Sequence, residues 1–413
     1  MVVSTGKFIR TLGDTKRILF VDDEPAVLDG QRKAFEPYHG QVECLFALGA
    51  AAALKTLQQT HVDVVVADMH MPEIDGPELL RIVKAEYPEI VRCMACPRHE
   101  MHSTYFALMT VQQILAKPLD PAAVMDMVER ACRLRELMTD SLRKKIGGVG
   151  QLPPIPAVYS ELSAAMAGPE VSSGKIAAIL EKDPAMAAKV LQLVNSACFG
   201  TLKHIGKLEH AVAYLGMDLI RDLSLTAQLF VDLQTIARQS GFSFEGEQQH
   251  SLLVARVAKR LLTRPAQARE AFTAGLLHDI GKLVLAVCIP KDYSEAHRAW
   301  KTTGRALHEV EYEVLGFTHS EAGAYLLGLW GLPAAIVEAV AFHHNPGAAL
   351  EQSFGVSSAV SLANSLVDET AINSSAGIME HLQALGVADN LPVWTDVAQE
   401  EVQQVRPERV FVQ

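Results

Sequence analysis

The chain has 413 residues, a formal net charge of −11, 49% hydrophobic residues and 21% charged residues. At roughly 150 residues per domain this length predicts two or three domains, and the composition is that of a globular chain, not a disordered one. The acidic charge argues against nonspecific nucleic-acid binding, the six scattered cysteines against a secreted disulfide scaffold, and the lack of an evident apolar run of about 18 residues against a membrane span.

The first third of the chain alternates between strand-like and helix-like segments. Short apolar runs predict strands at Arg17–Val21, Val62–Ala67, Val91–Ala95 and Ile114–Ala116. Helical spacing, with proline near each start, predicts helices over Pro25–Phe35, Pro77–Glu86 and Pro121–Met138. This alternation predicts an α/β fold, a doubly wound parallel sheet with helices on both faces.

Composition shifts after this segment. A basic, glycine-rich stretch from Arg143 to Gly150 and the proline-rich Leu152–Pro156 indicate a boundary. Helix formers then dominate, which predicts an all-α domain, and further helices are predicted at Val356–Val367, Gly377–Leu385 and Trp394–Val405. We expect an N-terminal tail (1–15), an α/β domain (16–138), a linker (139–152), a helical domain (153–350) and a helical C-terminal extension (351–413).

Charged side chains stand at the ends of three predicted strands. Asp22 and Asp23 end the first strand, Asp68 ends the valine-rich strand, and Lys117 ends the last. The carboxyl ends of parallel strands converge on one crevice. Three carboxylates there repel each other unless a divalent cation joins them, and oxygen ligands suit Mg²⁺. A carboxylate held in this way can attack phosphorus and form an acyl phosphate, while a lysine neutralises phosphate charge.

The motifs Val21-Asp22-Asp23-Glu24, Ala67–Pro72 with Asp75-Gly76, and Lys117-Pro118 resemble the receiver domain of two-component response regulators. The resemblance covers about Lys16 to Met138 and implies a flavodoxin-like fold. It implies that Asp68 is the phosphoacceptor and that Lys117 contacts the phosphoryl group. It also implies a Mg²⁺ site formed by Asp22, Asp23, Asp68 and the backbone carbonyl of His70.

Two positions depart from the receiver pattern. Cys96 stands where the family has the serine or threonine that binds the phosphoryl group, and a thiol is a weaker donor than a hydroxyl. Ile114 stands where the family has its switch aromatic, and it lacks a polar group. A receiver locked in one conformation is therefore an alternative to a switching one. Cys93 and Cys96 also form a Cys-x-x-Cys pair, which we interpret as two core residues because it closes a buried strand.

A His-Asp pair, His278-Asp279, lies in the apolar stretch Gly275–Lys282, which we expect to be helical. Both side chains are costly to bury unless they are paired or bound to a metal. Further candidates for metal ligands are His250, His319, His343 and His344. Helical bundles build metal sites from facing helices, so wide spacing is expected. Neighbouring residues on a helix point about 100° apart, so we expect His343 and His344 not to share one ion.

The order of these histidines resembles the HD phosphohydrolase superfamily, and the domain more closely resembles the HDOD family, over about Ile146 to Leu366. The motifs that carry this resemblance are Ile179–Pro184, Leu191–Gly200, Ala211–Gly216, His278–Lys282 and Trp330–Pro333. Asn364 stands where active HD enzymes have a final aspartate ligand, and a neutral amide is a poor substitute. HDOD domains are generally noncatalytic, so a divalent transition metal and a buried hydrogen-bond network remain alternative roles for the cluster.

Together these features predict a cytoplasmic response regulator. A sensor histidine kinase would phosphorylate Asp68, and the helical domain would signal to an unidentified downstream protein without catalysis. One alternative is a metal-dependent HD-type phosphohydrolase or phosphodiesterase regulated by the receiver. Another is a phosphorylation-independent scaffold with a degenerate receiver. We expect no specific nucleic-acid or membrane partner.

Two smaller expectations concern helix faces. The apolar stripe of Ala123–Met138 would serve either homodimerisation or packing on its own sheet. We also expect three glutamates to be exposed charged residues on a helix, namely Glu309, Glu311 and Glu313.

Overall fold

The structure is a computed structural model of the whole chain. It describes residues 15–97, 111–135, 145–149, 156–167, 172–195, 205–217, 240–349, 351–367 and 376–405, together with residues 152, 220 and 237. Most of the predicted N-terminal tail and linker, residues 136–138 of the last α/β helix, and the motif residues 196–200 lie outside this set. The chain divides into two compact units, one mainly before residue 150 and one mainly after it.

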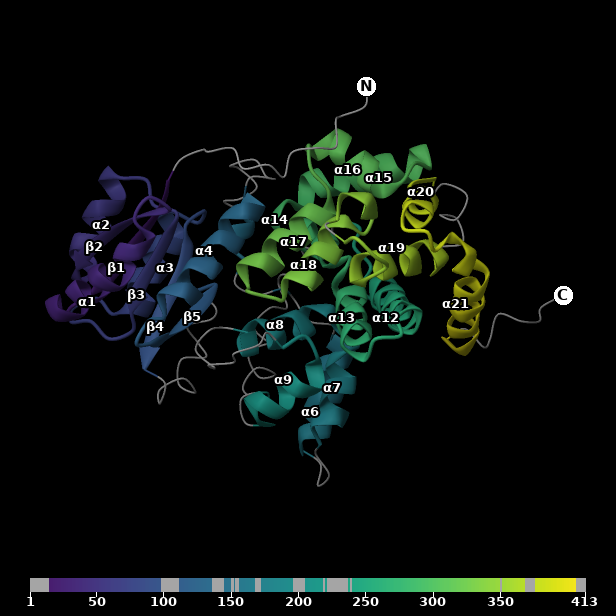
Figure 1. The fold of residues 1–413 in the computed structure, drawn as a ribbon, viewed down its shortest axis with the longest axis horizontal. Helices are drawn as coiled ribbons and strands as arrows, with labels where there is room; N and C mark the ends of the chain where they lie inside the picture. Colours follow the sequence, from purple (N-terminus) through teal and green to yellow (C-terminus); the bar gives the residue numbers. More distant parts are fainter. Residues whose placement is uncertain are drawn as a thin grey trace. The chain divides into compact units, whose positions relative to one another are not determined.

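The N-terminal unit contains a five-stranded parallel sheet with the order β2-β1-β3-β4-β5. The strands are β1 (Lys16–Asp22), β2 (Val42–Leu48), β3 (Val64–Asp68), β4 (Val91–Pro97) and β5 (Gln113–Lys117). The described helices are α1 (Pro25–Phe35), α2 (Gly49–Gln59), α3 (Gly76–Glu86) and α4 (Pro121–Arg135) (Figure 1). Every residue of β3 is buried, so both faces of the sheet are covered there. The predicted doubly wound α/β fold is confirmed.

Strand β2 and helix α2 have no counterpart among the predicted elements. β2 is an edge strand, and only Val42 and Ala47 of its seven residues are buried, although residues 44–48 form an apolar run. α2 is rich in alanine, and the residue before it, Leu48, makes no side-chain cap. Both elements are additions to the predicted ones, and α2 lacks the proline that marked the start of the predicted helices.

The two cysteines of β4 point in different directions. The Cys93 thiol lies 3.8 Å from the sulfur of Met127 in α4, and the Cys96 thiol lies 3.5 Å from the sulfur of Met69. Residues three apart on a strand face opposite sides of a sheet, so the two thiols do not form a redox pair. Burial raises the pKa of Cys93 to about 12. The interpretation of both as core residues is confirmed.

A buried arginine joins β4 to the short helical segment at residues 145–147. The Arg92 side chain is 1% exposed, and it donates to the carbonyl oxygens of Pro88, Ile90 and Gly147 at 3.2, 2.9 and 2.6 Å. A Cβ atom on Gly147 would lie 2.2 Å from the Pro88 carbonyl oxygen, so glycine is required for this approach. Part of the predicted linker is thus an integral piece of the N-terminal unit.

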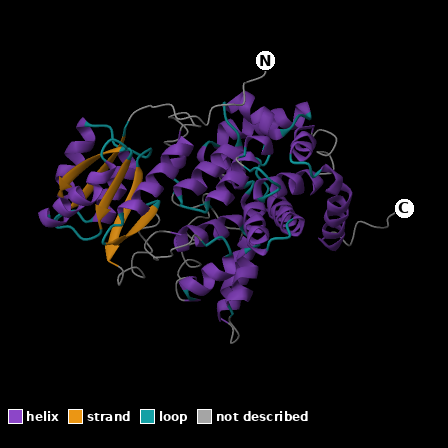
Figure 2. Ribbon diagram, in the orientation of Figure 1, coloured by secondary structure: helices purple, strands orange, loops and turns teal. Residues whose placement is uncertain are grey.

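The described strands and helices of the second unit are all helices, joined by loops (Figure 2). Its helices are α6 (Pro156–Ala167), α7 (Ser173–Leu180), α8 (Pro184–Asn195), α9 (Leu208–Leu215), α12 (Phe244–Leu261), α13 (Pro265–Leu277), α14 (Ile280–Cys288), α15 (Pro290–Thr303), α16 (Leu307–Leu315), α17 (His319–Leu329), α18 (Ala334–Phe342), α19 (Val356–Val367), α20 (Ala376–Ala384) and α21 (Leu391–Val405). Helices α12, α13, α18 and α19 pack against one another and form its centre. The predicted all-α class is confirmed.

The C-terminal extension packs on this helical unit. Helix α21 contacts α12 and α19. Arg260 of α12 pairs with Glu400 at 2.7 Å and with Glu401 at 2.9 Å, and Trp394 stacks on Phe354 with ring centroids 4.4 Å apart. The last helix is therefore part of the fold.

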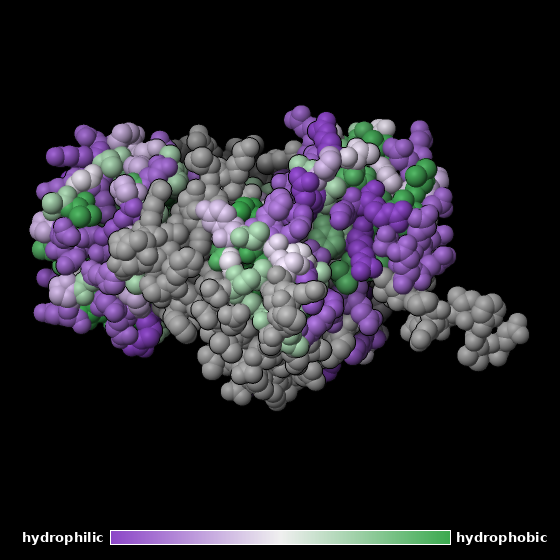
Figure 3. All heavy atoms as spheres, turned by 90° about the horizontal axis from the view of Figure 1, so that it is seen from below, coloured by the Kyte–Doolittle hydropathy of each residue, from purple (hydrophilic) through white to green (hydrophobic). Residues whose placement is uncertain are grey.

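The stretch Pro265–Cys288, which holds α13 and α14, is long and apolar enough to cross a membrane, with a mean hydropathy of 1.5. This departs from the expectation that the chain has no such segment. The most apolar 18 residues of this stretch are 78% buried inside the protein, as is usual for a core helix. Hydrophilic residues predominate among the described atoms on the face in Figure 3.

Candidate functional site

Three carboxylates meet at the carboxyl edge of the sheet. Val21 of β1 pairs with Ala67 of β3, so the strand ends place Asp22 and Asp23 beside Asp68. One oxygen from each of the three lies within 4.8 Å of the others. The donor set consists of carboxylate oxygens only, which fits Mg²⁺. The structure therefore brings together the three side chains predicted for this site.

Lys117 reaches the same carboxylates from the end of β5. Its ammonium nitrogen lies 2.6 Å from Oδ1 of Asp68 and 3.0 Å from Oδ2 of Asp22. Burial raises the pKa of Asp68, although its hydrogen bond with Lys117 opposes this rise. Burial disfavours the charged lysine, but hydrogen bonds with the two aspartates outweigh it and raise the pKa of Lys117. Lys117 is thus placed to contact a group attached to Asp68.

The loop after Asp68 approaches its backbone closely. A Cβ atom on Gly76 would lie 2.0 Å from the Asp68 carbonyl oxygen, and the Gly76 amide donates to the Met69 carbonyl at 3.0 Å. Asp75 caps α3 by accepting from the Glu78 amide. The Asp75-Gly76 motif therefore holds the loop against the strand end. His70 lies in this loop with an exposed side chain, and the role of its carbonyl stays a prediction.

Neither switch position carries a hydroxyl or aromatic group. Cys96 is fully buried, and its thiol lies beside Met69 and donates to the Pro97 carbonyl at 3.3 Å. Ile114 is 2% exposed within β5. Both side chains belong to the core, so neither position offers a hydroxyl group at this end of the sheet.

The second cluster surrounds Asp279 in the helical unit. His278 and Asp279 lie between α13 and α14, at the end of one helix and the start of the next. Around the carboxylate, α12 contributes His250, the start of α17 contributes His319, and the turn after α18 contributes His343 and His344. The structure brings all the predicted histidines together.

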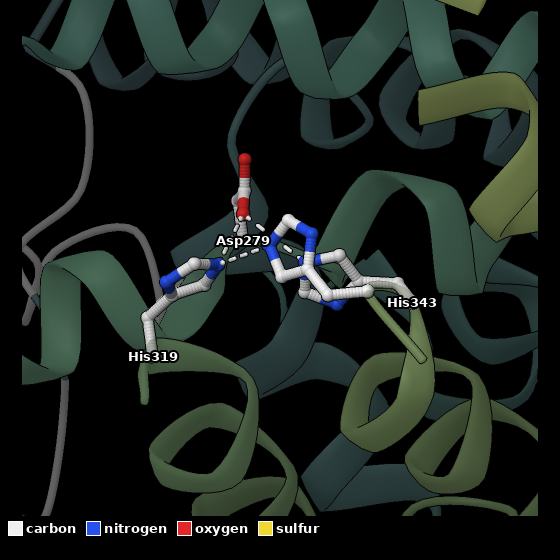
Figure 4. Close-up of side chains that lie close together, drawn as sticks. Asp279, His319 and His343 are labelled. Carbon is white, nitrogen blue, oxygen red and sulfur yellow. Dashed lines mark hydrogen bonds and ion pairs between the residues drawn. The ribbon is translucent and has the colours of Figure 1, made fainter. Parts of the chain in front are cut away.

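Asp279 is the centre of this cluster. Its Oδ1 lies 3.2 Å from Nε2 of His319 and 3.6 Å from Nε2 of His343, which approach it from two sides (Figure 4). Its Oδ2 lies 3.2 Å from Nε2 of His278 and 2.7 Å from the ammonium nitrogen of Lys282. Burial disfavours the ionised carboxyl, but His278 and Lys282 outweigh it and hold the pKa of Asp279 well below its usual value.

Two of the histidines are fixed in the tautomer that binds metals. Nδ1 of His278 donates to the Gly275 carbonyl at 2.7 Å, and Nδ1 of His343 donates to the Val340 carbonyl at 2.8 Å. Each ring therefore presents a lone pair at Nε2 when neutral. Both Nε2 atoms are buried and have no hydrogen-bond partner among the described residues. Burial lowers the pKa of His343 well below its usual value, which keeps that lone pair free.

The donor atoms have the spacing of ligands around one ion. In a tetrahedral site with bonds of about 2.0–2.1 Å, neighbouring donors lie about 3.3–3.4 Å apart. The atoms of Asp279, His319, His343 and His344 all lie within 4.8 Å of one another, and the closest pairs are 3.1–3.2 Å apart. The cluster therefore fits a divalent transition metal in both spacing and donor type.

His319 has a buried carboxylate partner in α16. Glu311 was expected to be exposed like Glu309 and Glu313, but it is 0% exposed and accepts from Nδ1 of His319 at 2.6 Å. Burial disfavours the charged ring, but the charge of Glu311 and hydrogen bonds with both carboxylates raise the pKa of His319 to about 9. The expectation is corrected for Glu311, whereas Glu309 and Glu313 are exposed.

His343 and His344 both enter the cluster, contrary to the expectation from helix geometry. Helix α18 ends at Phe342, so the two histidines lie in a turn and not on a regular helix. Nε2 of His344 lies 3.1 Å from Nε2 of His319. The angle of about 100° between helix neighbours therefore does not apply to this pair.

Asn364 lies beside the cluster. Nε2 of His250 donates to Oδ1 of Asn364 at 3.0 Å and lies 3.6 Å from Oδ2 of Asp279. Burial and the nearby His278 lower the pKa of His250 to about 4. Because its Nε2 carries the proton in this hydrogen bond, His250 does not present a lone pair there as His278 and His343 do.

Other motif residues of the helical unit have structural roles. Asp183 accepts from the amides of Ala185 and Met186 and so caps α8. The Asn195 side chain exchanges hydrogen bonds with the backbone of Ile205. Both residues hold loop conformations outside the Asp279 cluster.

Comparison with known proteins matches the two units to two families. Residues 18–129 match the response regulator receiver domain, and residues 152–346 match the HDOD domain. The chain therefore combines a receiver domain of two-component response regulators with an HDOD domain.

Individual relatives match only part of the chain, at low sequence identity. An uncharacterized protein of Treponema pallidum is 25% identical over 216 residues, which cover 52% of this chain and 42% of the relative. The sensor kinase CckA of Brucella abortus is 36% identical over 81 residues, 19% of this chain and 8% of the kinase. The chain thus spans less than half of the length of these relatives. A virulence factor of Campylobacter jejuni has a similar fold, with 19% identity, a TM-score of 0.52 and coverage of 64% of this chain and 97% of that one.

Proposed function

We propose that the chain is a response regulator whose receiver is phosphorylated on Asp68 and whose HDOD domain passes the signal to a protein partner. The observation that carries this proposal is the cluster of Asp22, Asp23 and Asp68, with the Lys117 ammonium 2.6 Å from Asp68. A sensor histidine kinase is the proposed donor, supported by the receiver match and by the segment shared with a sensor kinase. Such a system operates in the cytoplasm.

The roles of the residues follow from their positions. A carboxylate oxygen of Asp68 attacks the phosphorus of a phosphohistidine, forming an O–P bond as the N–P bond to the leaving imidazole breaks. Asp22, Asp23 and Asp68 would hold Mg²⁺, which would supply positive charge to the transferring group. Lys117 gives up its contact with Asp68 and binds a phosphoryl oxygen instead. The new charge of about −1.5 to −2 then biases the conformation of the receiver.

A phosphorylation assay tests this proposal. Full-length protein is incubated with Mg²⁺ and acetyl phosphate, and intact mass spectrometry measures the addition of one phosphoryl group. We expect labelling of the wild type and of Asp29→Asn, an exposed carboxylate of α1, but not of Asp68→Asn. An unlabelled wild type, or equal labelling of Asp68→Asn, contradicts the assignment. Hydrogen exchange then compares the conformation of the labelled and unlabelled proteins. An unchanged exchange pattern favours the phosphorylation-independent scaffold, and Cys96 and Ile114 would explain that result.

A specific observation favours a second function, metal binding by the HDOD domain. The buried Nε2 atoms of His278 and His343 make no hydrogen bond among the described residues, and they lie 3.2 and 3.6 Å from carboxylate oxygens of Asp279. We propose that Asp279, His319, His343 and His344 hold a divalent transition metal, with His278 beside Asp279. Such an ion would act as a Lewis acid. Hydrolysis is less well supported, because Asn364 replaces an acid and the Lys282 ammonium contacts Asp279 at 2.7 Å.

Elemental analysis tests the metal proposal. Purified protein, prepared without chelator, is compared with the variants His343→Gln and His210→Gln, the second of which changes an exposed histidine of α9. We expect stoichiometric metal in the wild type and in His210→Gln, and loss of metal in His343→Gln. A folded wild type that neither contains metal nor takes up added Zn²⁺ overturns the proposal and leaves the cluster as a hydrogen-bond network.

A further inference from the structure

Helix α16 places one carboxylate inside the helical unit. Glu311 is 0% exposed, and its Oε2 accepts two hydrogen bonds from His319, one from the backbone amide at 2.8 Å and one from Nδ1 at 2.6 Å. Its Oε1 is buried and has no hydrogen-bond partner among the described residues. Burying a carboxylate is costly, so its place behind His319 calls for more than packing.

The neighbouring glutamates of α16 behave differently. Glu309 and Glu313 are exposed and pair with Arg305 at 3.4 and 2.6 Å. Only Glu311 of these three faces the interior. The same helix therefore offers a functional candidate and two matched surface controls.

A second residue of α16 contacts the cluster. His308, one turn before Glu311, stacks on His344 with ring centroids 4.0 Å apart and an interplanar angle of 17°. Nε2 of His344 in turn lies 3.1 Å from Nε2 of His319. Helix α16 thus touches both of the adjacent histidines, through a carboxylate and through a ring.

We propose that Glu311 is a positioning residue, which holds the Nδ1 proton of His319 and directs Nε2 of that ring toward Asp279. The two bonds to one carboxylate oxygen fix both the backbone and the ring of His319. The negative charge behind the ring also makes Nε2 a better donor to a metal, an effect that second partners of metal-bound histidines commonly have. This inference rests on the proposed metal site.

Zinc affinity and ring tautomers test the inference in full-length protein. Zn²⁺ alone is titrated in competition with a chelating dye, for wild type, Glu311→Gln and Glu313→Gln. We expect Glu311→Gln to bind Zn²⁺ about 10- to 100-fold more weakly and Glu313→Gln to bind it like the wild type. Glutamine keeps the shape of the side chain, and circular dichroism checks that the variant folds. With Co²⁺ in place of Zn²⁺, the visible spectrum of Glu311→Gln should also change.

A metal-free measurement separates the two proposals. Nitrogen-detected NMR of histidine rings reports whether Nδ1 of His319 carries a strongly hydrogen-bonded proton. We expect that signal in the wild type and Glu313→Gln, and its loss or a large upfield shift in Glu311→Gln. If the wild type binds no Zn²⁺, the metal proposal fails and the ring signal alone decides the role of Glu311. Equal Zn²⁺ affinity, or an unchanged His319 signal, in Glu311→Gln overturns the inference.

Discussion

The ammonium nitrogen of Lys117 lies 2.6 Å from Oδ1 of Asp68. The same nitrogen lies 3.0 Å from Oδ2 of Asp22, so one cation from β5 links acids at the ends of β1 and β3. All three side chains are mostly buried, and the two carboxylates would otherwise repel each other. The lysine therefore offsets the negative charge that a bound Mg²⁺ would also offset.

We expect Lys117→Met to lower the free energy of unfolding of the receiver by about 1–3 kcal/mol, because it leaves buried carboxylates without their partner. Mg²⁺ should stabilise this variant more than the wild type, since it replaces the missing charge. Urea denaturation with and without Mg²⁺ measures both effects. Lys55→Met, an exposed position on α2, is the control. An equal gain from Mg²⁺ in wild type and Lys117→Met would contradict the shared role.

Gly281 permits the close contact of α14 with α17. A Cβ atom there would lie 1.8 Å from the His319 carbonyl oxygen, so Gly281→Ala must push α17 away. We expect a loss of about 1–3 kcal/mol or more in unfolding free energy, which is typical of overpacking. Thermal denaturation measures it, and weaker Zn²⁺ binding should accompany it as His319 moves. Gly377→Ala, in open space on α20, should be neutral, and equal stability of the two variants would refute this explanation.

The cysteines of β4 should resist thiol reagents in the folded protein. The pKa of Cys93 is raised to about 12 by burial, so its reactive thiolate appears only as the pH approaches that value. Cys44 is partly exposed, and we expect it to be alkylated faster than Cys93 and Cys96 at pH 8. Peptide mass spectrometry after iodoacetamide treatment measures this order. Detection of a Cys93–Cys96 disulfide in native protein would disprove the assignment to opposite faces of the strand.

Asn364→Asp should raise the pKa of His250 above its value of about 4, because a carboxylate 3.0 Å from Nε2 favours the charged ring. The charged fraction of His250 at a given pH would increase accordingly. NMR titration of the ring measures the shift. The added acid should also strengthen Zn²⁺ binding, whereas Asn345→Asp, an exposed residue outside the cluster, should leave the His250 titration unchanged. An unaltered His250 pKa in Asn364→Asp would show that the two side chains do not interact in solution.

The receiver was predictable because its motifs lie at strand ends. Asp22, Asp68 and Lys117 each follow an apolar run, and parallel strands must bring those ends to one edge. The edge strand β2 was not predicted, although its residues 44–48 are apolar, and most of its side chains stay partly exposed at the edge of the sheet. The sequence indicated which histidines belong to the cluster, but it did not indicate how they surround Asp279.

Glu311 shows why the rest of the site was missed. Burial is a property of the folded chain, and the sequence presents three glutamates at alternate positions. Helical spacing did indicate which glutamate faces the interior. Glu311 lies four residues from both Leu307 and Leu315, so it shares their face of the helix. Glu309 and Glu313 lie four and eight residues from Arg305, on a charged face. For His343 and His344, Asn345-Pro346 was the sign that the helix ends before them.

The contact of Arg92 with Gly147 sets a practical limit on how the receiver can be studied alone. The segment that matches the receiver family ends at residue 129, 18 residues before the Gly147 carbonyl that accepts from Arg92 at 2.6 Å. A fragment that ends at residue 129 would lack Gly147, so the buried guanidinium of Arg92 would lose one hydrogen-bond acceptor. It would also expose the Pro88 carbonyl oxygen, against which Gly147 packs. A fragment that runs past Val149 keeps this piece of chain in place, and only it reports the native stability of the receiver.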